Sequence, residues 1–183
     1  MSERQTVIRS LHDIGLAAWF GGSLFGAVGL NGASAAVSDP GDRTHVATAG
    51  WARWAPVNAA AIAVHSIGGI GLILGNRGRV VGQSGTRGNT VLKSAVTLAA
   101  MGVTAYSGSQ GAKLGKDSHA PAESGVDPAQ GTPQEIAKAQ KRLKVLQWSI
   151  PVLTGVLLVM GAQQGEQQKA GQVASGLLGS LKR

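Results

Sequence analysis

The chain has 183 residues, a length typical of one domain, and its formal net charge is +8 at pH 7. It contains no cysteine, which excludes disulfides and thiol chemistry, and only 4% of its residues are aromatic, which argues against a large soluble core. The 28 glycines are well above the ordinary share of about 7%. Many lie in apolar runs, where small residues let membrane helices approach closely.

The basic charge does not indicate a nucleic-acid partner. Lys and Arg lie between the apolar runs rather than along one face, a pattern typical of the connectors of a multi-span protein. We therefore expect a lipid bilayer as the surroundings of this chain and no nucleic acid.

The longest apolar run organises the chain. Ile14 to Ser38 carries no charged side chain, and a bilayer core about 30 Å thick needs roughly 20 apolar residues in a helix. We predict a first span at residues 12–34. Because the run is longer than the apolar part of a signal peptide, we expect the span to be retained.

Two further runs follow. Trp51 and Trp54 precede an uncharged stretch that predicts a second span at 55–75, where Pro56 suits the first turn of a helix. The third predicted span, 94–112, is diluted by Thr and Ser, so we expect it to need neighbouring helices for insertion.

The last third of the chain contains a connector, a span and a tail. Residues 113–131 are rich in Pro, Gly and Ser and predict a mobile loop. The segment TPQE at 132–135 is typical of a helix start, and the helix leads into a fourth span at 146–163, where Pro151 predicts a kink. Apolar residues at helical spacing predict an interfacial helix at 171–182.

Together these runs predict an all-α integral membrane protein, a bundle of four helices with an interfacial C-terminal helix. The N-terminus, the middle connector and the C-terminus would share one side. The middle connector carries Arg77, Arg79 and Arg87 and no acid, which indicates that this side is cytoplasmic. The same arginines are candidates for contact with anionic lipid or a partner's acidic patch, although they could serve topology alone.

His65, about halfway along the second span, is the candidate buried polar site, because ionisable groups at that depth are costly and usually have a partner. A neutral imidazole bonded to a neighbouring helix is the simpler interpretation. His12 would lie at the surface and His65 on the order of 15 Å deeper. We therefore expect that they do not share an ion, and we predict no cofactor and no metal site.

Small residues recur at four-residue spacing in the first and second spans. They predict helix-packing faces, either within the bundle or against another subunit, and they are Ala18, Gly22, Gly26, Gly71 and Gly75.

Two stretches resemble known proteins. Leu11–Gly22, with His12 before the span and a Trp-x-Gly-Gly motif within it, resembles the opening span of copper-resistance D-type membrane proteins, which would imply a metal or haem role for His12. Thr132–Gln168, with VLQW at 145–148 and GEQQ at 165–168, is similar to an uncharacterised family of small four-span membrane proteins from actinobacteria. That likeness implies the bacterial cytoplasmic membrane, with both termini cytoplasmic in our topology.

No constellation of reactive side chains suggests an enzyme. The leading hypothesis is a non-enzymatic accessory or scaffold subunit that packs its Gly/Ala faces against other membrane subunits, or against copies of itself. One alternative is a haem- or metal-binding redox protein using His12 or His65. Another is a small transporter or channel whose path is lined by Asn58, His65 and Thr104.

Overall fold

The structure is a computed structural model, and it describes residues 3–77, 84–117 and 119–167. These residues form four long helices and no strand, which confirms the prediction of an all-helical chain. The helices and their connecting turns are α1 (Glu3–Phe25), a π-helical turn (Gly26–Leu30), α2 (Asn31–Ala33), a 3-10 turn (Ser34–Ala36), α3 (Pro40–Gly75), α5 (Ser84–Leu114), a 3-10 turn (Gly115–Asp117) and α6 (Gln134–Gln167). The predicted helix at 171–182 lies outside the described residues.

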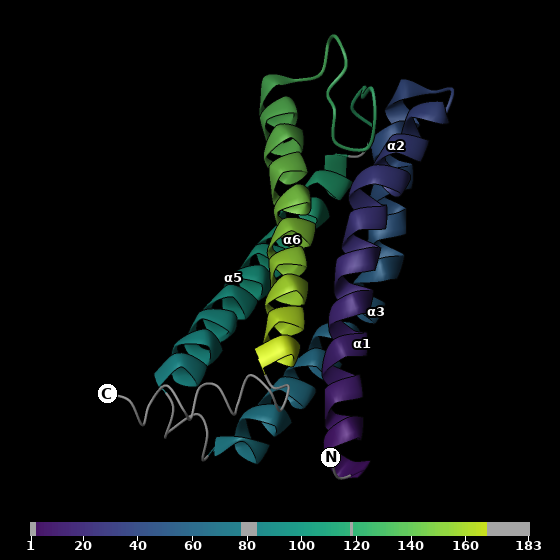
Figure 1. The fold of residues 1–183 in the computed structure, drawn as a ribbon. Coiled ribbons are helices and arrows are strands. Elements are labelled where there is room, and N and C mark those ends of the chain that lie inside the picture. Colours follow the sequence, from purple (N-terminus) through teal and green to yellow (C-terminus); the bar gives the residue numbers. More distant parts are fainter. Residues whose placement is uncertain (1–2, 78–83, 118, 168–183) are drawn as a thin grey trace, which may run out of the picture.

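The four long helices alternate in direction (Figure 1). The start of α1, the end of α3, the start of α5 and the end of α6 therefore lie at one end of the molecule. The α1–α3 connection and the 115–133 connector lie at the other end, called the connector end below. This is the alternation that four membrane crossings require.

Helix α1 is the most extensively packed element. It lies along α3 on one side and along α6 on another, while α6 also packs against α5. Helix α5 runs obliquely and touches α3 only slightly (Figure 1). The apolar core forms where α1, α3, α5 and α6 approach one another, and its buried members are Leu16, Trp19, Ala61, Ala100, Ile150 and Leu157.

Three of the described helical segments are long and apolar enough to cross a membrane: Gln5–Ala36, Pro40–Gly75 and Gln134–Gln163. Helix α5, which contains the predicted third span, is not among them. At 1.5 Å per residue, the 36 residues of α3 extend about 54 Å, well beyond a bilayer core of about 30 Å. Part of the bundle must therefore project from any bilayer that it crosses.

The register of α1 against α3 differs from the register that the predicted spans assume. Gly71 of α3 lies against Ile8, and Trp54 lies against Gly22, so the second apolar run lies beside residues 8–22 of α1. The helix of α1 already begins at Glu3. The segment of α1 that lies beside the second apolar run therefore begins nearer the N-terminus than residue 12, where the predicted first span begins.

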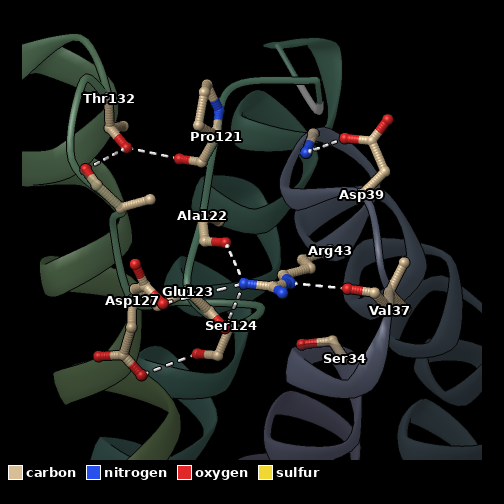
Figure 2. Close-up of polar contacts among 12 residues, drawn as sticks. Ser34, Val37, Asp39, Arg43, Pro121, Ala122, Glu123, Ser124, Asp127 and Thr132 are labelled. Atoms are coloured by element: carbon tan, nitrogen blue, oxygen red, sulfur yellow. Dashed lines mark hydrogen bonds and ion pairs between the residues drawn. The ribbon is translucent and has the colours of Figure 1, made fainter.

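The connector between α5 and α6 is held against Val37 and the start of α3 (Figure 2). Arg43 donates from Nε to the Val37 carbonyl at 2.8 Å and from Nη1 to the Ala122 carbonyl at 3.2 Å. Ala122 and Val126 are buried. We expected a mobile loop at 113–131; in the structure α5 continues through Leu114, and residues 119–133 carry these contacts.

An ion pair ties the same connector to α6. Lys144 Nζ lies 2.6 Å from Asp127 Oδ1, and Ser124 Oγ donates to Asp127 Oδ2 at 2.7 Å. Burial favours a raised pKa for Asp127, but the hydrogen bonds from Lys144 and Ser124 and the charge of Lys144 outweigh burial, so its pKa is lowered.

Candidate functional site: a stacked histidine pair

Two glycines bring the backbones of α1 and α3 into direct contact. A Cβ added at Gly15 would lie 2.5 Å from the His65 backbone nitrogen, and one added at Gly68 would lie 2.5 Å from that of His12. No larger residue fits at either position without separating the helices. The two histidines that flank this contact are consequently held face to face.

His12 and His65 form a reciprocal pair. Nδ1 of His12 lies 2.9 Å from the His65 carbonyl oxygen, and Nδ1 of His65 lies 2.9 Å from the His12 carbonyl oxygen. The rings stack with their centroids 4.0 Å apart and their planes 22° from parallel. Because a carbonyl oxygen only accepts, each Nδ1 must carry the hydrogen, which leaves Nε2 of each neutral ring as an acceptor.

This arrangement corrects the expected separation of His12 and His65. We placed His12 at the surface and His65 about 15 Å deeper, and that expectation was wrong. It took Asp13 as the boundary of the first span, whereas α1 begins at Glu3 and places His12 well inside the bundle. Both residues are buried, with exposed fractions of 6% and 1%.

Charged side chains lie near the pair. Lys93 of α5 and Asp13 of α1 act electrostatically on both imidazoles, and Asp13 and Arg9 act on Lys93. Lys93 also reaches α6, because its Nζ lies 3.6 Å from the position that a Cβ on Gly161 would occupy. The sequence placed Lys93 in a connector, and it did not predict that this cation acts on the two histidines.

Trp19 closes the bundle next to the pair. Its indole is fully buried, meets the His65 ring edge-on at a centroid distance of 6.2 Å, and donates from Nε1 to Thr104 Oγ1 at 3.2 Å. Two of the residues predicted to line a transport path, His65 and Thr104, therefore both contact Trp19. The third, Asn58, is also buried.

A second polar layer lies toward the connector end. Asn31 Nδ2 donates to Gln147 Oε1 at 2.6 Å, and Trp51 Nε1 donates to Asn31 Oδ1 at 2.9 Å. Gln140 Nε2 donates to Thr44 Oγ1 at 3.2 Å. The sequence did not predict this layer.

The sequence feature that could have predicted this polar layer is a seven-residue repeat of residues that can form hydrogen bonds. In α3 the repeat places such residues on the buried helix face at 44, 51, 58 and 65, and in α6 at 140, 147 and 154. A seven-residue repeat returns to nearly the same face of a helix after two turns.

Some buried polar side-chain atoms have no hydrogen-bond partner among the described residues. They are Ser23 Oγ, Trp54 Nε1, Asn58 Oδ1 and Gln140 Oε1. Such groups are few in native interiors, because each one costs desolvation free energy.

The small-residue faces serve contacts within the chain. A Cβ at Gly22 or Gly26 would collide with the indole of Trp54 or Trp51, respectively, and Gly71 lies against Ile8. Ala18 packs on the core, and a Cβ at Gly75 would lie 3.8 Å from Gln5 Nε2. Helix α3 therefore occupies the face of Gly22 and Gly26 that docking another subunit would require.

The structure describes two of the three arginines of the predicted basic connector. Arg77 follows the end of α3, Arg87 lies near the start of α5, and both are exposed at the same end of the bundle. Arg79 lies outside the described residues.

In this arrangement the two stacked rings cannot serve as the two axial ligands of one haem iron. Two axial histidines hold haem iron from opposite faces of the macrocycle, whereas the rings here stack 4.0 Å apart on each other. Among the described residues, no group of three or more His, Cys, Asp or Glu side chains is placed to hold a metal ion. The stack is a hydrogen-bonded contact between two helices.

Fold and site together define a helical protein with three segments able to cross a membrane and a polar pair between its two most closely packed helices. No protein-family model, curated protein or solved structure matches the chain.

Proposed function

We propose that the chain is a non-enzymatic accessory subunit of a larger membrane protein complex. It crosses the bacterial cytoplasmic membrane four times, with both termini in the cytoplasm. The observation that carries this proposal is the position of α5, which is the least suited to lipid of the four long helices and also has an uncovered side.

Helix α5 packs on α6 with one face, which includes Ala100, Val103 and Ser107. The opposite face, called the open face of α5 below, consists of exposed residues at spacings of four and three: Gly88, Leu92, Ala95, Ala99 and Gly102. A Cβ at Gly88 or Gly102 would meet nothing within 4 Å. Small residues on a membrane helix admit close approach of a second helix, so this face suits a helix of another subunit.

The composition of α5 supports a protein neighbour rather than lipid. It lacks an 18-residue window as apolar as those of the three spanning segments. A helix of that kind inserts weakly alone and gains stability when neighbouring helices shield its polar groups. Helix α6 shields only one face, so a partner helix on the open face would complete the fourth crossing.

The basic end of the bundle supports the proposed orientation. Arg77 and Arg87 lie at the end that also holds the start of α1 and the end of α6. Arginines in a short connector favour the cytoplasmic side, where anionic lipid headgroups are available to pair with them. On this orientation, the connector end lies outside the cytoplasm.

The test is site-specific photo-crosslinking in native membranes. A photoreactive residue at Ala99, on the open face, should give one discrete protein adduct, and Gly102→Leu should abolish it by filling the face. The control is the same probe at Ile70, an exposed position on α3, which should label lipid only. An adduct with a second copy would identify the partner as the chain itself. Absence of a protein adduct at Ala99, with monomeric protein after mild solubilisation, would refute the proposal.

A further inference from the structure

The histidine pair has chemistry that the accessory-subunit proposal does not use. Both Nδ1 hydrogens are committed to carbonyl oxygens at 2.9 Å. The remaining ring nitrogens, Nε2 of His12 and Nε2 of His65, carry lone pairs and are the only positions on the two rings that can take a proton.

We propose that His12 and His65 together form one proton-binding site, which takes up a single proton rather than two. The first proton converts one ring to an imidazolium stacked on a neutral ring, an arrangement in which a π face meets a cation. A second proton would place two like charges with ring centroids 4.0 Å apart between buried helices, where water screens them little.

Two charged side chains act on this site in opposite directions. Asp13 of α1 favours an added positive charge on the pair, and Lys93 of α5 opposes it. Arg9, one turn before Asp13, acts on Lys93. From α3 the site receives His65 itself, and α6 brings Gly161 toward Lys93. The charged side chains that act on both rings are thus one anion, Asp13, and one cation, Lys93.

Proton uptake leaves the contact between α1 and α3 intact. An imidazolium still donates from Nδ1, so both 2.9 Å hydrogen bonds to the carbonyl oxygens persist in the protonated pair. Gly15 and Gly68 keep the two backbones in contact in either state. The site is therefore a place where a proton resides inside the helix pair, and it does not act as a switch that separates the helices.

The first experiment is ¹⁵N NMR of the full chain, labelled at histidine, in lipid nanodiscs during acidification. The exposed His45 and His119 provide reference signals, which His45→Asn and His119→Asn assign. We expect His12 and His65 to show the Nδ1–H tautomer and to gain one proton between them. An Nε2–H tautomer on either ring, uptake of two protons, or no uptake while the helices remain folded would overturn the proposal.

The second experiment uses two variants with opposite expected shifts. Asp13→Asn should move the proton uptake of the pair to lower pH, because it removes the favourable charge. Lys93→Met should move uptake to higher pH, because it removes the opposing one. If Asp13 and Lys93 had only a structural role, the two variants would not shift the pH of proton uptake in opposite directions. Shifts of the same sign, or no shift, would therefore also overturn the proposal.

Discussion

Gly15→Ala tests whether α1 and α3 touch as closely as the structure shows. The added Cβ would lie 2.5 Å from the His65 nitrogen and 2.6 Å from the Ala61 carbonyl oxygen. Ordinary contact needs about 3.5 Å, so the helices must move apart by about 1 Å. Each 2.9 Å hydrogen bond between His12 and His65 would then stretch beyond the range of a real bond.

The expected cost combines two losses. Interhelical hydrogen bonds in membranes are worth about 0.6 kcal/mol on average and up to about 1.7 kcal/mol. Overpacking a tight contact costs roughly 1–3 kcal/mol more. Gly15→Ala should therefore lower the free energy of unfolding by about 2–4 kcal/mol, partly offset by up to about 1 kcal/mol of helix propensity gained by replacing glycine.

Gly21→Ala is the matched control. Gly21 lies in the same helix, and a Cβ there would meet nothing within 4 Å. The propensity gain is the same, so Gly21→Ala should be neutral or stabilising. The assay is denaturant unfolding in detergent micelles, followed by circular dichroism. If Gly15→Ala proves as stable as Gly21→Ala, the close contact and the histidine geometry built on it are refuted.

Three further predictions concern the polar interior and the connector. The stabilisation that Asp127 contributes is present above about pH 4 and is lost as the pH falls through its lowered pKa. The difference in Tm between wild type and Lys144→Gln should therefore shrink below about pH 4. A difference in Tm that does not depend on pH would contradict the ion pair. Asn31→Leu leaves the amide of Gln147 and the indole bonded to Asn31 unpaired, and should cost about 2–4 kcal/mol in denaturant unfolding; a cost below about 0.5 kcal/mol would contradict that network. Arg43→Gln removes the hydrogen bonds from Arg43 to the carbonyl oxygens of Val37 and Ala122, so limited proteolysis within residues 119–133 should become several-fold faster. An unchanged rate of proteolysis would contradict the role of Arg43 in holding the connector.

Helix content was readable from the sequence, because uncharged apolar runs of about 20 residues are much longer than strands and match a membrane-spanning helix. The weak third span was also readable: α5 is the long helix that falls short of spanning hydropathy. The register between helices was not readable. Gly15 and Gly68 allow the backbones of α1 and α3 to touch, and a glycine in a glycine-rich run gives no sign of which neighbour it faces.

That missing register explains why the histidine pair was not predicted. The position of His12 was inferred from the distance to the nearest charge, Asp13, as though charges marked the membrane surface. In the structure Asp13 and Lys93 lie near the pair, so a charge-based boundary misplaced it. The seven-residue repeat of polar positions in α3 and α6 is a better guide, because it identifies a buried face without reference to any boundary.

The polar contacts also account for how glycine-rich helices keep one arrangement. Faces made of Gly and Ala fit together in several registers, because small side chains interlock weakly. Helix α1 and its continuation, α2, place a hydrogen-bonding side chain against each of the other three long helices: His12 against α3, Trp19 against Thr104 of α5, and Asn31 against Gln147 of α6. Sliding any helix by one turn would break its bond and leave a buried donor unpaired. Close packing thus comes from the small residues, and the choice of register comes from these three polar side chains.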